Sequence, residues 1–158
     1  MAIAISVISL FVSIATFIWN YNRNKFKMSV KIEAIFVKPY TSEDKKIGYI
    51  IIAHFENNSA NPISIGSISA NGIYSKKTVI YGKGEHGQKI NKSISPFPLD
   101  LNSYQAKRAT FFIPSAEANE NTDENLCLKT YTTRGVHKRN ANYFDYKQRL
   151  IDLFVGKY

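Results

Sequence analysis

The amino-acid sequence predicts an all-β fold: an antiparallel sandwich of about seven to eight strands, preceded by one transmembrane helix and followed by a short C-terminal helix. Three patterns lead to this prediction. Residues 2–19 carry no charged side chain, residues 29–143 contain short alternating segments, and no helical pattern separates those segments. Strands spaced about ten residues apart, without helices between them, are typical of antiparallel sandwiches and barrels.

Residues 1–22 form the predicted membrane anchor. From Ala2 to Trp19 the chain has 18 uncharged residues. As a helix these measure about 27 Å, close to a hydrocarbon core of about 30 Å. Trp19 and Tyr21 lie where an aromatic belt would meet the headgroups. The side chains that we expect in the membrane are the large apolar ones: Ile3, Ile5, Val7, Leu10, Phe11, Val12, Ile14, Phe17, Ile18 and Trp19.

Other interpretations of this first segment fit less well. A cleaved signal peptide needs a basic start and small residues before the cleavage site, whereas this segment ends in Phe-Ile-Trp. A lipoprotein needs a cysteine to carry the lipid, and none occurs near residue 20. A helix buried between protein subunits remains an alternative, because an apolar helix can be buried in protein or in lipid.

Residues 23–28 form a basic segment that predicts the orientation of the anchor. Arg23, Lys25 and Lys27 follow the apolar residues, and no basic side chain precedes them. Because basic residues remain on the cytoplasmic side of a membrane, we expect the C-terminal domain in the cytoplasm. We also expect these three side chains to contact lipid headgroups.

One face of the predicted anchor carries small polar residues, Ser6, Ser9 and Ser13, at spacings of three and four. Such a face predicts close packing against a second helix, so a homo-oligomer formed through the anchor is one hypothesis. The alternative is that the serine hydroxyl groups bond to carbonyl groups of their own helix.

The remaining chain has the size of one domain, because about 130 residues are enough for one hydrophobic core. The formal net charge is +9, and the only cysteine, Cys127, cannot form an internal disulfide bond. A basic surface suits anionic cytoplasmic lipids. We expect no nucleic-acid partner, because the basic residues are not interleaved with stacking aromatic residues in a recognisable module.

The sandwich is predicted over residues 29–143 and begins with two clearly patterned strands. Residues 29–37 alternate in polarity, and residues 47–55 are apolar on both faces, which is typical of a strand in the middle of a sheet. The residues of the first strand that are expected on one apolar face are Val30, Ile32, Ala34 and Phe36.

The later strands are shorter and are separated by turns. Asn71 and Gly72 predict a tight hairpin, and residues 82–98, rich in glycine and proline, predict a long loop. Residues 144–158 predict an amphipathic helix and tail, capped near Asp145. The remaining predicted strands are residues 63–68, 74–81, 99–101, 105–113, 126–133 and 136–143.

Four segments carry a resemblance to known proteins: Phe55–Ile65, Ser95–Leu101, Phe111–Pro114 and Thr130–Gly135. Together with the apolar and basic start, they resemble the small membrane-anchored, immunoglobulin-like β-sandwich proteins of Gram-positive bacteria and their prophages. The resemblance covers nearly the whole chain and rests on turns and strand edges. It implies an immunoglobulin-like topology. Most such proteins have no assigned function, and some anchored prophage proteins of this size block superinfecting phages, an analogy only.

A glycine pattern at residues 82–87, GKGEHG, matches the spacing of a dinucleotide-binding loop. Such a loop must open a helix that holds the pyrophosphate, and the residues that follow here do not form a helical pattern. We therefore expect an ordinary connector. The neighbouring lysines that could bind a small anion are Lys83, Lys89 and Lys92.

The residues capable of acid-base or metal chemistry are scattered along the chain. No two of His54, His86 and His137 have the close spacing of a metal-binding pair, and Cys127 lacks the surroundings of a catalytic thiol. The acidic segment 115–125 lacks the ligand spacing of a calcium loop. We therefore expect no catalytic residue, no metal and no cofactor, and hence no enzyme.

Two classes of function remain. The first is an interaction module, anchored to the membrane, that acts by contact with a protein partner in phage exclusion, host defence or assembly. The second is a ligand-gated membrane effector, whose β domain senses a small anion and whose anchor oligomerises through its serine face.

Overall fold

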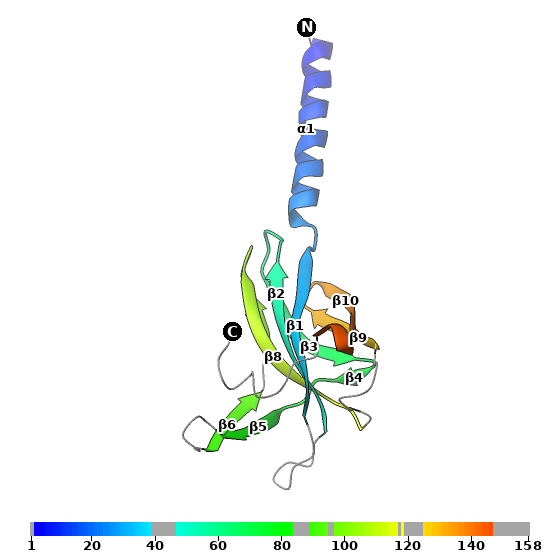
Figure 1. Cartoon of the computed structure of the whole chain (residues 1–158). Coiled ribbons are helices and arrows are strands. Elements are labelled where there is room, and N and C mark those ends of the chain that lie inside the picture. The colour runs from blue at the N-terminus through cyan, green and yellow to red at the C-terminus, as the bar shows by residue number, and fades with distance from the viewer. Residues whose placement is uncertain are drawn as a thin grey trace.

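An apolar helix followed by a domain of antiparallel strands makes up the protein (Figure 1). The computed structural model describes residues 2–38, 47–83, 89–94, 97–116, 118 and 125–146. Helix α1, Ala2–Asn24, stands away from the domain, and most of the other described residues lie in strands. The prediction of an all-β domain behind one apolar helix is therefore confirmed at this level.

The first sheet has three antiparallel strands in the order β1-β2-β8. They are β1, Met28–Lys38; β2, Gly48–Asn57; and β8, Ala106–Pro114. Strand β2 lies in the middle, as its apolar character on both faces predicts. One of its faces presents Ile51, Ala53 and Phe55 to the main core, whereas Ile50 and Ile52 join a second apolar cluster on the other face.

The second sheet has five strands, in the order β10-β9-β3-β4, with β7 also paired to β3. A hairpin turn at Asn71 and Gly72 joins β3 to β4, with φ values of 49° and 85°. Positive φ at both central residues is what a tight two-residue hairpin requires, so this prediction is confirmed. The strands are β3, Ile63–Ala70; β4, Ile73–Tyr74; β7, Leu99–Leu101; β9, Asn125–Thr132; and β10, Gly135–Asn142.

The main core lies between the two sheets. Large side chains of both sheets are fully buried there, and each stabilises the fold by about 1.5–3 kcal/mol. Tyr143, in the four-residue helix α2, Tyr143–Tyr146, packs its ring at 5.6 Å from that of Tyr49. The largest contributors are Ile35, Tyr49, Ile51, Phe55, Ile65, Phe111 and Tyr143.

A β-bulge changes the faces of β1 and corrects the prediction for that strand. Ile32 pairs with Ala53, but Ala34 pairs with the adjacent Ile52, so Glu33 is the extra residue. Beyond the bulge the alternation changes phase, because one inserted residue moves every later side chain to the other face. Val30 and Ile32 face the main core as predicted, joined by Ile35 and Val37, whereas Ala34 and Phe36 lie in the second cluster.

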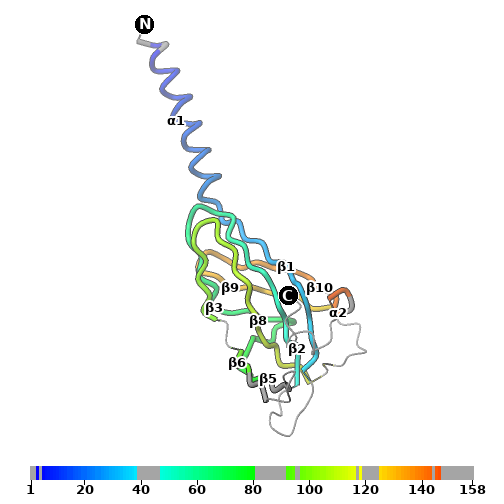
Figure 2. Tube along the Cα trace, turned by 60° about the vertical axis from the view of Figure 1, so that its left-hand side comes forward, coloured from blue at the N-terminus to red at the C-terminus, as the bar shows by residue number. Residues whose placement is uncertain are grey.

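A hairpin that the sequence pattern does not reveal covers this second cluster. The segment predicted as one strand over 74–81 divides into β4 and β5, Thr78–Lys83, and part of the predicted 82–98 loop forms β6, Lys89–Ile94. Ile80 and Ile94 of the hairpin pack with Phe36, Ile50, Ile52 and Phe112 of the first sheet. The hairpin therefore covers the outer face of that sheet at the end away from α1 (Figure 2).

Only the first residues of the predicted C-terminal helix lie within the described part of the chain. Helix α2 covers Tyr143–Tyr146. Residues 147–158, which contain most of the predicted amphipathic helix, lie outside the described residues, as do His86 and most of the acidic segment 115–125.

Candidate functional site

Helix α1 is long and apolar enough to cross a membrane. Its 23 residues measure about 34 Å as an α-helix. Its large apolar side chains have no protein neighbours to cover them: Phe11 is 68% exposed and Trp19 is 70% exposed. The helix extends to Asn24, two residues beyond the predicted end of the anchor.

Hydrogen bonds on the serine face of α1 support the interpretation that its hydroxyl groups bond to carbonyl groups of their own helix. The Ser13 hydroxyl group donates a hydrogen bond to the Ser9 carbonyl oxygen over 2.9 Å, and Thr16 bonds in the same way to Val12 over 2.8 Å. These groups are satisfied within the helix. Ser6, Ser9 and Ser13 are all exposed on its surface.

The junction between α1 and the domain is short and is hydrogen-bonded to two separate turns. Only residues 25–27 separate Asn24 from β1. The Asn24 side-chain oxygen accepts a bond from Asn61 Nδ2 over 3.1 Å, and its main-chain carbonyl accepts one from Arg134 Nη2 over 2.9 Å. The Lys27 carbonyl accepts a bond from the Asn58 amide over 2.9 Å. These bonds fix the direction in which the domain leaves the helix.

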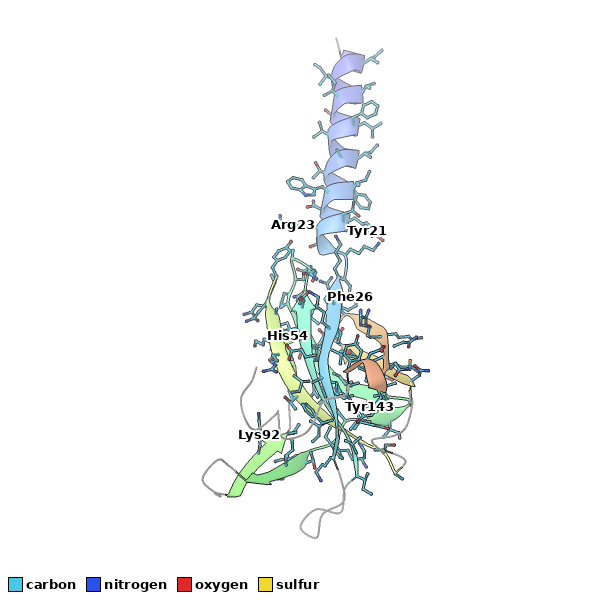
Figure 3. The ribbon with its side chains drawn as sticks, viewed as in Figure 1. Tyr21, Arg23, Phe26, His54, Lys92 and Tyr143 are labelled. Carbon is cyan, nitrogen blue, oxygen red and sulfur yellow. The ribbon has the colours of Figure 1, made fainter. Side chains whose placement is uncertain are left out.

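The predicted lipid-contacting residues lie at this junction. Arg23, Lys25 and Lys27 are all exposed, at the base of the helix and in the following link. Figure 3 places Tyr21 and Arg23 on the last turns of α1, with Phe26 below them where the chain enters the domain.

A buried asparagine supports the β2–β3 turn, which is one of the two turns bonded to the junction. Asn57 is 1% exposed, and its Nδ2 group donates to the carbonyl oxygens of Asn61 and Asn102 over 2.8 and 2.9 Å. Its Oδ1 atom accepts bonds from the Ser59 amide and hydroxyl groups. Buried polar groups must be paired, and the side chain of Asn57 meets this requirement by bonding to two loops, at Asn61 and at Asn102.

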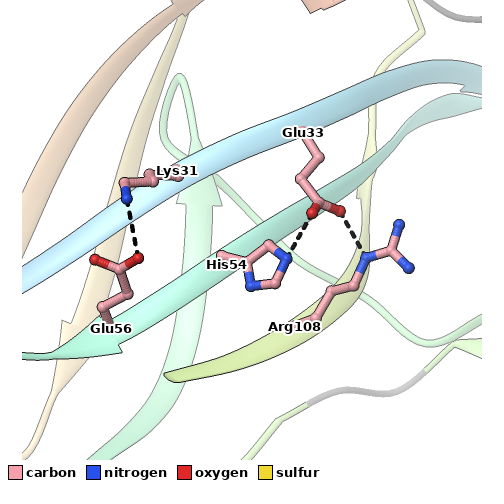
Figure 4. Close-up of polar contacts among 5 residues, drawn as sticks. All are labelled: Lys31, Glu33, His54, Glu56 and Arg108. Carbon is pink, nitrogen blue, oxygen red and sulfur yellow. Dashed lines mark hydrogen bonds and ion pairs between the residues drawn. The ribbon is translucent and has the colours of Figure 1, made fainter. Parts of the chain in front are cut away.

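The outer face of the first sheet carries an ionic cluster of five side chains (Figure 4). The Glu33 carboxylate lies 2.5 Å from His54 Nε2 and 2.6 Å from Arg108 Nε, while Lys31 pairs with Glu56 at 3.1 Å. These side chains are partly exposed, and such pairs contribute little to stability. Among the described residues, no group of three or more His, Cys, Asp or Glu side chains could hold a metal ion.

The outer face of the second sheet carries a set of residues that we call the tyrosine patch: Tyr74, Lys129, Tyr131, Val136 and Lys138. Tyr131 lies opposite Val136 and Lys129 lies opposite Lys138 across the β9–β10 pair. The Tyr74 and Tyr131 rings are 5.5 Å apart. Tyr74 is 53% exposed and Val136 is 49% exposed. Apolar and aromatic area thus lies beside two adjacent positive charges.

The electrostatics of the patch follow from these neighbours. The pKa of Tyr131 is lowered, first by the neighbouring Ser69 hydroxyl group, then by Tyr74, and further by the charges of Lys129 and Lys138. The pKa of Tyr74 is raised, chiefly by its hydrogen bond with Tyr131. The two phenol groups therefore influence one another, and that of Tyr131 ionises more readily.

The candidate anion-binding lysines lie on the β5–β6 hairpin, far from the helix. Lys83 and Lys89 are opposite one another in the ladder, and their side chains lie outside the described part of the chain. Lys92 is exposed, and Figure 3 shows it on β6. It borders a groove of about 320 Å³, whose other lining residues are Ser93, Ile94, Leu99, Arg108, Ala109 and Thr110.

The remaining candidates are separate from one another. Cys127 is half-buried on β9, and its amide donates to Asn71 Oδ1 over 2.8 Å. His137 is half-buried on β10, where burial first and the Arg139 charge second lower its pKa. His54 belongs to the ionic cluster instead.

Comparisons with protein-family models and with curated proteins give no match to this chain.

Proposed function

We propose that this chain is a single-pass membrane protein whose immunoglobulin-like β-sandwich lies at the cytoplasmic face of the cell membrane and binds a protein partner there. The length and exposure of α1 support the anchor. Arg23, Lys25 and Lys27 support the orientation, because basic residues flank the cytoplasmic end of a span. Protease added outside intact cells is then expected to leave the domain uncut, and its degradation there would contradict the orientation.

The observation that carries the proposal is the tyrosine patch. Two lysines directly opposite one another on a sheet destabilise it, since like charges repel. Lys129 and Lys138 have that arrangement, next to the exposed ring of Tyr74 and the half-buried ring of Tyr131. Aromatic residues are enriched at the centres of protein interfaces, and complementary charge aligns the partners. The patch therefore suits a protein partner with an acidic surface.

The junction makes this patch effective at a membrane. Because bonds from Asn61 and Arg134 hold Asn24, the domain is presented in one direction instead of swinging on a flexible stalk. Confining two partners to the same membrane raises their effective concentration and strengthens a weak contact. An interface of modest affinity on the patch is therefore sufficient to hold a partner in the same membrane.

Photo-crosslinking in a Gram-positive cell tests the proposal. A photoreactive phenylalanine analogue replaces Tyr131 in one protein and Tyr104, an exposed tyrosine outside the patch, in a matched control. We expect one discrete crosslinked product from position 131 and none from position 104, and its loss when Lys129→Glu and Lys138→Glu are added. Equal products from both positions, or none from position 131, would refute the proposed interface.

The resemblance to anchored prophage proteins suggests phage exclusion or host defence as the setting, and this part of the proposal has its own test. Phage plating on cells that express the protein is the measurement. Since binding by contact requires no proton transfer, alanine at His54, His86, His137 or Cys127 is expected to preserve exclusion. Deleting residues 2–22 is expected to abolish it.

A second candidate function, a ligand-gated membrane effector, is favoured by the groove beside Lys92. Lys92 and Arg108 line it from different elements, which suits a small anion. Inorganic phosphate should then raise the melting temperature of the whole protein but not that of the Lys92→Ala variant. Equal melting temperatures with and without phosphate would favour the interaction module.

A further inference from the structure

A notch lies at the base of α1 where the helix meets the link to the domain. Four of its lining residues lie at positions i, i+3, i+4 and i+7 of the helix and therefore share one face of α1: Phe17, Asn20, Tyr21 and Asn24. Lys25 and Phe26 complete the lining, and the volume is about 490 Å³. The notch therefore has an apolar ring at its upper end and a cation at its lower end.

Its depth follows from the length of the apolar part of α1. Ile3 to Trp19 measure about 25 Å as a helix, which covers most of a hydrocarbon core of about 30 Å. Phe17 then lies at the inner edge of the acyl chains, and Asn20, Asn24 and Lys25 lie among the headgroups. The notch runs along the helix in the same sense as a lipid, from acyl chain to phosphate.

The chemistry of the lining selects a negative headgroup. Lys25 supplies an ammonium group, and amide groups of Asn20 and Asn24 can donate to phosphate oxygens. The Asn24 Oδ1 atom already accepts a bond from Asn61, which turns its Nδ2 donor group away from that contact. No acidic residue occurs before Glu33 in the sequence, so nothing in this segment opposes a phosphate.

We propose that the notch lined by Phe17, Asn20, Tyr21, Asn24, Lys25 and Phe26 binds one phospholipid with an anionic headgroup. The Lys25 ammonium and the two amides hold the phosphate, while Phe17 packs against the upper part of an acyl chain. This inference rests on the proposed membrane anchor and goes beyond it, since it assigns one residue of the basic segment to one bound lipid.

The test uses the whole protein in nanodiscs of equal parts phosphatidylcholine and phosphatidylglycerol, followed by gentle extraction and native mass spectrometry. Lys25→Gln removes the cation of the notch. Lys27→Gln is the comparison for general headgroup attraction. It makes the same charge change in the same segment, at a residue that is also expected to meet headgroups but does not line the notch. Both side chains are exposed, so neither change disturbs the core.

We expect wild type and Lys27→Gln to retain one phosphatidylglycerol, and Lys25→Gln to retain about tenfold less, the effect of losing one charge-assisted contact. Lys25→Arg should restore retention. Equal losses in both glutamine variants would instead indicate general attraction to an anionic surface, and retention of phosphatidylcholine would remove the headgroup preference. A lipid-free dimer would show that a second helix fills the notch. Each of these outcomes overturns the proposal.

The outcome is separable from that of the proposed function. Failure of the chain to resist alkaline extraction from membranes would refute the anchor itself. Loss of lipid retention with a normal crosslink at position 131 would refute only the notch.

Discussion

Arg134 and Asn24 are 110 residues apart in the chain, yet Arg134 Nη2 donates a hydrogen bond to the Asn24 carbonyl oxygen over 2.9 Å. The bond ties the β9–β10 turn to the last residue of α1. With the Asn61 contact on the same residue, it connects the second sheet and the β2–β3 turn to the anchor.

Replacing Arg134 and Asn61 together by alanine is expected to free the domain from the helix without unfolding it. Both bonds are exposed, so each contributes about 0.5–1.5 kcal/mol. Spin labels on Cys127 and on a Trp19→Cys variant report the distance between domain and anchor, and its distribution should broaden. Arg139→Ala, an exposed arginine of β10, is the control and should leave the distribution narrow. An unchanged distribution in the double variant would show that the link itself is stiff.

Replacement by alanine should strongly destabilise the fold at one glycine of the sheets and have little effect at another. A Cβ atom on Gly48 would overlap the Ile113 carbonyl oxygen and lie 2.8 Å from Pro114 Cα, both main-chain atoms of the neighbouring strand. A Cβ atom on Gly66 would meet nothing within 4 Å. We expect Gly48→Ala to cost about 3 kcal/mol or more, because strands β2 and β8 must move apart. Gly66→Ala should change the free energy of unfolding by about 0.5 kcal/mol or less. Equal midpoints in urea unfolding would argue against the close approach.

The β5–β6 hairpin should depend on its two buried isoleucines. Ile94 is 3% exposed in the second cluster, so Ile94→Ala should cost about 2–5 kcal/mol. Lys92→Ala, two residues away on the same strand and exposed, should be nearly neutral. Denaturant unfolding measures both, and proteolysis within the hairpin should increase only for Ile94→Ala. A neutral Ile94→Ala would mean that the hairpin does not cover the first sheet.

His137 should make the stability of the domain depend on pH. Its pKa is lowered in the folded state by burial and then by Arg139, so the unfolded chain, with an ordinary value of 6.5, takes up the proton first. The contribution to stability is therefore complete above about pH 6.5 and is lost as the pH falls through the lower folded pKa. His137→Gln should flatten this dependence in denaturant unfolding measured on both sides of that window. Identical profiles for both proteins would assign the effect to other groups.

The strands with strong local patterns were predictable, because local spacing determines them. Residues 47–55 are apolar on both faces and do form the central strand β2, and Asn71 and Gly72 form the expected hairpin turn. The bulge at Glu33 was not predictable, since only pairing with β2 reveals that Ile32 and Ala34 match adjacent residues. Strand β6 was missed for a similar reason. Its sequence, KINKSI, has few apolar residues, and the apolar side chains of Phe36 and Phe112 on the outer face of the first sheet decide where it packs.

Only those parts of the candidate site that are continuous in sequence were predictable. The apolar helix and the basic segment after it are continuous in sequence, so composition predicts them. The tyrosine patch joins Tyr74 and Tyr131 from strands on either side of β3, and this proximity depends on sheet order. The Glu33 contacts to His54 and Arg108 likewise require the order β1-β2-β8. An outward-facing tyrosine on a predicted strand was the signal that could have pointed to the patch.

The short, bonded junction has a rotational consequence. Each residue of an α-helix turns the chain by about 100°. Because Asn24 and Lys27 are bonded to the domain, that rotation passes from α1 to the sheets. One residue inserted into the helix would therefore rotate Tyr131 by about 100° about the helix axis, whereas seven inserted residues would return it to nearly its original direction. In the proposed membrane protein, the number of residues in α1 therefore determines which side of the domain faces its neighbours in the plane of the membrane.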